Sequence, residues 1–246
     1  MKKFTFAPLA LIGLLSFGAA TMFQSCSDDD DDNAYLLLQP TALVTVCPTS
    51  DGTFTMQLDD TTTLHPSNMK SSPFGEKEVR ALVNYTEDVE SPANLNYVKI
   101  NWIDSIRTKL PVPTAGELNN SKYGIDPIEI VKDWVTVAED GYLTLRFRTR
   151  WGHTNAPHYI NLVSGVNPDN PYEFELHHNA QGDINGNFGD ALIAFNLNEL
   201  PLDKDRNIKI KLNWRSFSGD KSTEFSLMLR PKNNYSEPLE YSRYVK

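Results

Sequence analysis

The chain has 246 residues, with 23 lysines and arginines, 32 aspartates and glutamates, and only two cysteines. Its net charge of −9 excludes strong affinity for nucleic acid or an anionic membrane surface, because such binding depends on clustered Lys and Arg side chains. The length is sufficient for one large β domain or two small ones, with cores that need no disulfide.

The N-terminus has the three parts of a secretory signal peptide. Lys2 and Lys3 precede the apolar run FAPLALIGLLSFGAA, and small or polar residues then lead to Cys26. Cleavage after residue 25 removes two lysines and no acid, so the net charge of −9 becomes −11. No later stretch reaches the roughly 18 apolar residues of a membrane-spanning helix.

The segment Phe23-Gln24-Ser25-Cys26 resembles the lipobox of bacterial lipoproteins. The resemblance implies that the Cys26 thiol receives a diacylglyceryl group, that the chain is cut before it, and that the protein labels with palmitate. Two or three acyl chains anchor a protein stably, since each buried CH₂ contributes about 0.8 kcal/mol. The alternative is an ordinary cleavage site followed by an incidental cysteine.

The residues after Cys26 resemble the acidic export signal of Bacteroidota surface lipoproteins. They are Ser27, Asp28, Asp29, Asp30, Asp31 and Asp32. The resemblance implies an outer-membrane protein that is lipid-anchored and exposed at the cell surface. A run of like charges cannot fold on itself, so we expect residues 26–34 to form an extended tether. The alternative is a spacer that only aids solubility.

Residues 35–112 are predicted to form a first β domain of about five short strands. The strands are expected in YLLLQPTALVTVC, GTFTMQL, TTTLH, VRALVNYTE and YVKINWIDSIRTKL, in which apolar and polar residues alternate. Asp51-Gly52 is typical of a hairpin turn. Cys47 is interpreted as a small buried residue and not as a reactive thiol. A disulfide between Cys47 and Cys26 cannot form if the Cys26 sulfur is lipidated.

Residues 113–246 are predicted to form a second β domain. The Pro-, Gly- and Asn-rich stretch at 110–127 is expected to link the two domains. Asp140-Gly141 predicts a hairpin turn. The strands that follow have the spacing of an antiparallel sandwich. One strand should place Leu143, Leu145 and Phe147 on one face, and another should place in the core the residues Ile208, Ile210, Leu212 and Trp214.

The acidic lipobox head, the opening AYLLLQPTALVTV, and the later WVTVAEDGYLTLRFRTRWG and HYINLV together resemble the NigD-like family of Bacteroidota lipoproteins. The resemblance implies an all-β chain, with an N-terminal OB-like barrel followed by an antiparallel β-sandwich. It supplies no catalytic residues. The family's namesake lies in a bacteriocin gene cluster, which suggests an immunity or protective role as one alternative.

The histidines do not form a recognisable metal site. No His-Glu-x-x-His motif is present, and His177 and His178 are adjacent in a predicted strand, so they point to opposite faces. We expect them at the surface near a hairpin. The loop at 183–190 has oxygen ligands at alternate positions, but Phe188 and Ala194 replace the Gly and Glu of a calcium loop. A hairpin loop with residues at positive φ is predicted instead. No metal or cofactor is expected.

Paired carboxylates leave one enzymatic alternative open. Glu173 with Glu175, or Asp203 with Asp205, could serve a glycan hydrolase if both acids faced one cleft. In an acidic β protein such residues are usually solvated strand and turn positions. We therefore expect no catalytic activity.

A set of basic side chains alternates with the apolar faces of two predicted strands. If these strands were neighbours, one sheet face would be cationic and could bind an anionic glycan, lipopolysaccharide or an acidic partner. The alternative is a solvated sheet face. The residues of this predicted stripe are Arg146, Arg148, Arg150, Lys209, Lys211 and Arg215.

The barrel domain offers two further candidates. Tyr85, Tyr97 and Trp102 could be platforms for an oligosaccharide or peptide, although core packing is the alternative for Trp102. Asp60-Thr61-Thr62 resembles a short motif for Bacteroidota O-glycosylation on Thr61, and Ser105 lies in a similar triplet. Altogether the sequence predicts a surface lipoprotein that binds a glycan, peptide or protein partner, with a hydrolase or an immunity lipoprotein as alternatives.

Overall fold

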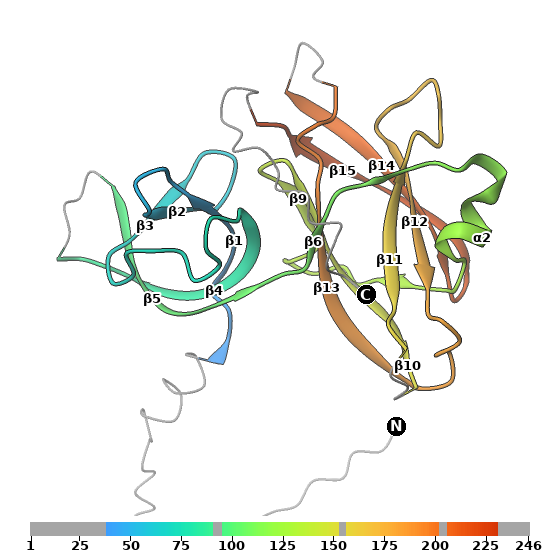
Figure 1. Ribbon diagram of the computed structural model, residues 1–246, viewed down its shortest axis with the longest axis horizontal. Coiled ribbons are helices and arrows are strands. Elements are labelled where there is room, and N and C mark those ends of the chain that lie inside the picture. The colour runs from blue at the N-terminus through green and yellow to red at the C-terminus, as the bar shows by residue number, and fades with distance from the viewer. Residues whose placement is uncertain (1–37, 91–94, 153–155, 202–205, 231–246) are drawn as a thin grey trace, which may run out of the picture. The chain divides into compact units, whose positions relative to one another are not determined.

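The computed structural model describes residues 38–90, 95–152, 156–201 and 206–230, all of which belong to one compact unit that begins at Leu37 (Figure 1). Cys26, the acidic residues 27–32 and the pair Asp203 and Asp205 lie outside the described residues. No helix within the described ranges is long and apolar enough to cross a membrane.

The first five strands close into a barrel (Figure 1). Apolar side chains at alternate positions fill its interior, among them Val44, Met56 and Val83. The parallel pairing of β3 with β5 completes the closure, as expected for an OB-like barrel. Around the barrel the order is β1 (Ala42–Pro48), β2 (Phe54–Gln57), β3 (Thr63–Pro66), β5 (Asn96–Ser105) and β4 (Val79–Glu87).

Two five-stranded sheets form the remainder, the predicted sandwich. One sheet has the order β6 (Thr108–Lys109), β13 (Asn187–Asn196), β10 (Tyr142–Trp151) and β8 (Glu129–Ile130), and β9 also pairs with β10. β9 covers Val137–Glu139. The other sheet has the order β15 (Gly219–Met228), β14 (Asn207–Ser216), β12 (Glu173–Asn179), β11 (Tyr159–Ser164) and β7 (Val112–Pro113).

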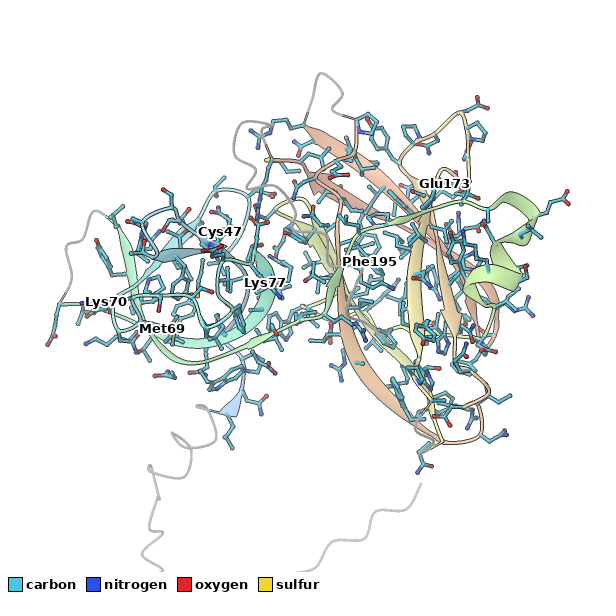
Figure 2. All side chains as sticks on the ribbon, in the orientation of Figure 1. Cys47, Met69, Lys70, Lys77, Glu173 and Phe195 are labelled. Atoms are coloured by element: carbon cyan, nitrogen blue, oxygen red, sulfur yellow. The ribbon has the colours of Figure 1, made fainter. Side chains whose placement is uncertain are left out.

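The sandwich core lies between these two sheets. Leu143 pairs with Phe195, which is labelled in Figure 2, and both side chains are buried. The predicted inward face of β14, which carries Ile208, Ile210, Leu212 and Trp214, belongs to the same core, so that prediction is confirmed. Residues on alternate positions of a strand share one face, and burial of that face stabilises the sandwich.

The stretch predicted to link the domains forms part of the sandwich. β6 pairs in parallel with β13, and β7 pairs in parallel with β11. A short 3-10 turn (Gly116–Leu118) and the helix α2 (Asn119–Tyr123) follow β7. Tyr123 is buried, and its hydroxyl donates to the Pro113 carbonyl at 2.7 Å. The chain thus enters the sandwich at Thr108, directly after the last barrel strand.

Candidate functional site

Strand β1 is buried on both faces. Val44 and Val46 fill the barrel, whereas Leu43 packs with Ile106 and with Ala194 of the sandwich. Thr45, also on the outer face, is fully buried. This double burial explains why the segment ALVTV is almost uninterruptedly apolar, and it locates the surface that the barrel shares with the sandwich.

Arg80 crosses this junction from barrel strand β4. Its side chain has no exposed surface, and its guanidinium donates to Thr45 Oγ1 at 2.9 Å, to Thr144 Oγ1 at 3.4 Å and to Glu139 Oε1 at 2.7 Å. Burial raises the pKa of Glu139, and the charge of Arg80 only partly opposes that increase. Partners on β1, β10 and β9 hold Arg80, so the guanidinium ties the barrel to the sandwich.

The β9–β10 turn meets the barrel at its tip. Asp140 and Gly141 have φ values of 50° and 74°, which is the double left-handed geometry of the hairpin turn predicted from these two residues. The Asp140 amide donates to Asp60 Oδ1 of the barrel at 2.7 Å, and the Gly141 amide donates to Met228 O at 3.1 Å. A Cβ on Gly141 would lie 1.8 Å from Asn198 Oδ1, so only glycine fits there.

A second arginine, Arg230, binds two carboxylates beside this turn. Its guanidinium donates to Asp140 Oδ1 at 2.6 Å and to Glu78 Oε1 at 2.8 Å, and it lies 5.5 Å from the centre of the Tyr142 ring. The Tyr142 hydroxyl donates to Glu78 in turn. Burial lowers the pKa of Arg230, but the bond to Asp140 and the charge of Glu78 outweigh it and raise that pKa overall.

A cavity of about 320 Å³ opens beside this cluster, between the barrel and the end of β15. Its polar wall contains two arginines, three carboxylates and three uncharged side chains. They are Arg206, Arg230, Asp60, Glu78, Asp140, Thr55, Gln57 and Thr63. We call this space the junction cavity. Its wall offers donors and acceptors together, with charges of both signs.

Cys47, labelled in Figure 2, lies on the wall of the junction cavity, and it is opposite Thr55 in the β1–β2 pairing. Burial, followed by the charge of Glu78, raises the pKa of the Cys47 thiol to about 12. The thiol donates a weak hydrogen bond to Thr45 O at 3.6 Å. Because the thiolate is the nucleophile, a pKa this high predicts little reactivity of Cys47 at neutral pH.

The structure separates the two halves of the predicted cationic stripe. β10 and β14 belong to different sheets, so the arginines of β10 and the basic residues of β14 do not share a face, and the prediction of one stripe is wrong. Within β10, Arg146 contacts Asp133 at 2.7 Å and Asp190 at 2.7 Å, and Arg148 contacts Asp190 at 2.5 Å. These bonds lower the pKa of the Asp190 carboxyl.

Three of the four remaining basic residues of the predicted stripe also have local roles. The Arg150 guanidinium lies 4.3 Å from the centre of the Phe188 ring. Lys211 pairs with Glu173 at 2.9 Å, and Arg215 contacts Asp220 at 3.5 Å. Lys209 is exposed on β14.

The carboxylate pair Glu173 and Glu175 is held by neighbouring side chains. Glu173, labelled in Figure 2, accepts from Asn167 at 3.0 Å, from Lys211 at 2.9 Å and from Asn213 at 2.9 Å. These bonds lower the pKa of Glu173 to about 2. Glu175 contacts His177 Nε2 at 3.0 Å. An acid with so low a pKa cannot serve as the proton donor of a glycosidase near neutral pH.

The histidines expected at the surface are buried instead. His177 is 7% exposed and His178 is 1% exposed, since α2 and the segment before β8 cover β12. The side chain of His158 is 3% exposed and stacks on Trp151 with ring centres 4.2 Å apart. Sequence periodicity did not predict this burial, because both faces of β12 are covered.

A hydrogen-bonded relay joins two of these histidines to an acid. His178 Nδ1 lies 3.3 Å from Pro127 O, so it carries a hydrogen and leaves Nε2 as an acceptor. His158 Nδ1, 3.0 Å away, donates to that nitrogen. His158 Nε2 then lies 3.3 Å from Asp183 Oδ2. Burial lowers the pKa of His178.

The loop at 183–190 packs around Trp151. A Cβ on Gly186 would lie 1.7 Å from Trp151 O, and Trp151 Nε1 donates to Gly189 O at 3.0 Å. Close approach, and not the predicted positive φ, therefore explains these two glycines. The described ranges contain no group of three or more His, Cys, Asp or Glu side chains that could hold a metal ion.

The other barrel candidates lie apart from the junction cavity. Tyr85 packs against the barrel core, and the Tyr97 ring lies 5.6 Å from that of His65. Trp102 is half-buried. Thr61 is exposed in the β2–β3 turn, where its hydroxyl donates to Asp59 at 2.9 Å, so its modification stays a prediction.

Comparison with known proteins agrees with this architecture. Residues 43–106 match the family model of the NigD-like N-terminal OB domain, and residues 110–227 match that of the NigD-like C-terminal beta sandwich domain. A search of curated proteins found no significant match.

Several solved structures are similar. A protein from Parabacteroides distasonis, described as a candidate toxin-related protein, is 33% identical, with a TM-score of 0.63 over 75% of this chain and 91% of that one. A NigD-like immunity protein from Bacteroides caccae is 21% identical, with a TM-score of 0.54 over 74% and 90%. A candidate lipoprotein from Bacteroides fragilis is 13% identical, with a TM-score of 0.54 over 78% and 98%. The chain belongs to the NigD-like family.

Proposed function

We propose that this protein is a lipid-anchored binding protein at the cell surface and that its ligand enters the junction cavity. The lipobox ending at Cys26 supports the anchor, as does the fold it shares with a protein described as a candidate lipoprotein. The acidic residues after Cys26 support export to the surface. The binding role is carried by the chemistry of the cavity wall.

The charges of Arg230, Asp140 and Glu78 on that wall are matched within the protein. Arg230 is already bound to Asp140 and Glu78, and Asp60 accepts from the Asp140 amide. An ionic ligand would have to displace one of these contacts, which costs more than it gains in a partly buried site. A neutral ligand with many hydroxyl groups can use donors and acceptors together. The cavity therefore suits the end of a glycan chain.

The cavity is held in shape before a ligand arrives. Arg80 ties the barrel to the sandwich through two side chains, Thr144 and Glu139, and the Asp140-Gly141 turn is fixed to both domains. A preformed site loses less conformational entropy when a ligand binds, because its side chains and loops are already ordered. We expect binding without turnover, because the Cys47 thiol stays protonated and Glu78 is engaged by Arg230 and Tyr142.

The first test is capture of the ligand. The full chain would be applied to a glycan array and, in parallel, crosslinked on intact cells and recovered with its partners. The proposal expects retention of neutral glycans, recovered without cleavage. Release of reducing sugar from the retained glycan would instead support a hydrolase, and retention of anionic glycans alone would contradict the proposed cavity chemistry.

The comparisons favour one second candidate, an immunity function. One relative is described as a candidate toxin-related protein and another as a NigD-like immunity protein. An immunity lipoprotein would bind a toxin at the cell surface. Deletion of the gene should then sensitise the cell to a toxin secreted by related strains, and complementation should restore resistance.

A further inference from the structure

A second cavity, of about 260 Å³, lies between the two sheets of the sandwich. Ile130 at the end of β8 lies on one side of it, and Trp214 of β14 and Phe225 of β15 lie on the other. β8 and β15 each end the strand order of their sheet, so the cavity is at an open edge of the sandwich. We call it the edge cavity.

Trp214, on the wall of the edge cavity, carries an unsatisfied hydrogen-bond donor. Trp214 is 8% exposed, and its buried Nε1 has no hydrogen-bond partner within the described residues. The other tryptophan of this core, Trp151, donates through Nε1 to Gly189 O at 3.0 Å. Buried indole N–H groups normally find an acceptor, so the unpaired group on Trp214 points to an acceptor supplied by a ligand.

Two acceptors on the wall of the edge cavity, Asp133 and Thr136, are already engaged. The Asp133 carboxylate accepts from Arg146 at 2.7 Å and from the Thr136 amide at 3.2 Å. The Thr136 hydroxyl donates to Val131 O at 2.6 Å and accepts from the Arg146 amide at 3.1 Å. A sugar hydroxyl placed here would find the Thr223 hydroxyl as its one side-chain acceptor that no described protein donor engages.

The polar groups that remain are suited to an anion. Lys132 is exposed and forms no ion pair with any described residue, and the Thr223 hydroxyl forms no hydrogen bond within the described ranges. Together with Trp214 Nε1 they present a cation and donors beside an apolar wall. The chemistry therefore differs from that of the junction cavity, where Arg230 is paired with Asp140 and Glu78.

We infer that the edge cavity binds a small organic carboxylate with a flat apolar body. The carboxylate accepts from Lys132 Nζ and Trp214 Nε1, and the apolar body packs against Ile130 and Phe225. This site is distinct from the junction cavity. Its ligand can therefore bind whether or not a glycan binds elsewhere, and failure of either proposal leaves the other standing.

The test is ¹⁹F NMR on the full chain labelled with 5-fluorotryptophan, titrated with phenylacetate. The chain contains four tryptophans, and single Trp→Phe variants assign the four signals. We expect the Trp214 signal to shift with saturation while the Trp102 and Trp151 signals stay in place. The neutral isostere phenylacetamide should bind at least tenfold more weakly, because it lacks the charge that pairs with Lys132.

Two variants locate the carboxylate. Trp214→Phe keeps the aromatic ring but removes the N–H, and Lys132→Met keeps most of the aliphatic stem but removes the charge. Each should weaken phenylacetate binding about tenfold when followed by ligand-observed NMR. Lys209→Met is the matched control, because Lys209 is also exposed but lies on β14 beside the core residues Ile208 and Ile210.

Three results would overturn the inference. The first is no saturable shift of the Trp214 signal with phenylacetate. The second is equal binding of phenylacetate and phenylacetamide. The third is unchanged affinity in Trp214→Phe and Lys132→Met chains whose spectra show the native fold. A shift caused by methyl glucoside and not by phenylacetate would assign the cavity to a neutral sugar and would equally contradict it.

Discussion

Arg80 of the barrel and Glu139 of the sandwich form an ion pair with Nη2 and Oε1 2.7 Å apart, and no part of the Arg80 side chain is exposed. A buried guanidinium depends on its partners, because removal of one side leaves the other charge or its hydrogen-bonding groups without compensation. This pair therefore makes the packing of the two domains specific to one arrangement.

Substitution of Arg80 tests this role. Arg80→Met should lower the free energy of unfolding by about 3 kcal/mol, because it leaves Glu139, Thr45 and Thr144 without their donor. Urea denaturation followed by circular dichroism measures the change. The matched control is Arg148→Met, which removes a half-exposed arginine from a surface pair and should have little effect. Equal losses in both variants would show that the junction pair has no special role.

Acidification should weaken the fold through His178. Burial lowers the pKa of this side chain below its ordinary value of about 6.5, and the hydrogen bond to the Pro127 carbonyl only partly opposes that decrease. The folded state therefore favours neutral His178. Its contribution to stability is complete above about pH 6.5 and is lost as the pH falls below that value toward the folded pKa.

Histidine resonances in NMR spectra, assigned with a His178→Gln variant, report this titration directly. We expect the midpoint of His178 below 6.5 and a His178→Gln variant whose stability changes less between pH 7 and pH 5. A midpoint above 6.5 would contradict the burial argument.

The Cys47 thiol should resist alkylation in the folded protein. With a pKa of about 12, almost none of it is thiolate at pH 8. Treatment with iodoacetamide at pH 8, followed by peptide mass mapping, should leave the Cys47 peptide unmodified. The same treatment in urea should modify it fully. Rapid modification without denaturant would show that the junction cavity activates the thiol.

Glycines in the loop around Trp151 should differ in their tolerance of alanine. Gly186→Ala places a Cβ 1.7 Å from a backbone oxygen and should cost about 3 kcal/mol of stability. Gly182→Ala meets nothing within 4 Å and carries only the penalty of a φ of +85°, about 1 kcal/mol. Thermal unfolding of the two variants measures the difference, and a larger loss for Gly182→Ala would refute the close-approach explanation.

The alternation of apolar and polar residues in the sequence was sufficient to predict the strands and the core residues. Alternation in IKIKLNW identified the inward face of β14, and Asp140-Gly141 identified the turn that reaches the barrel. Both signals are local, since they depend on side-chain period and on backbone conformation. The NigD-like resemblance supplied the order of the two domains, which the family models confirm.

The junction was not predicted, because its partners are far apart in the chain. Arg80 and Glu139 are separated by 59 residues, and Glu78 and Arg230 by 152. One signal for the junction was available in the sequence. β1 and the start of β10 each contain consecutive buried residues, whereas a strand with one face in solvent alternates buried and exposed residues. The prediction of one cationic stripe was wrong for the same reason, since periodicity cannot show whether β10 and β14 belong to the same sheet or to different ones.

The most direct test of the account places a large side chain in the junction cavity. Thr55→Trp fills space on its wall, and Thr86→Trp adds the same side chain to an exposed position of the barrel strand β4. Binding of the neutral glycan retained on the array would be measured by calorimetry with the full chain. We predict that Thr86→Trp binds as the unmodified protein does and that Thr55→Trp binds at least tenfold more weakly. Equal binding by a correctly folded Thr55→Trp chain would contradict the assignment of the ligand to this cavity.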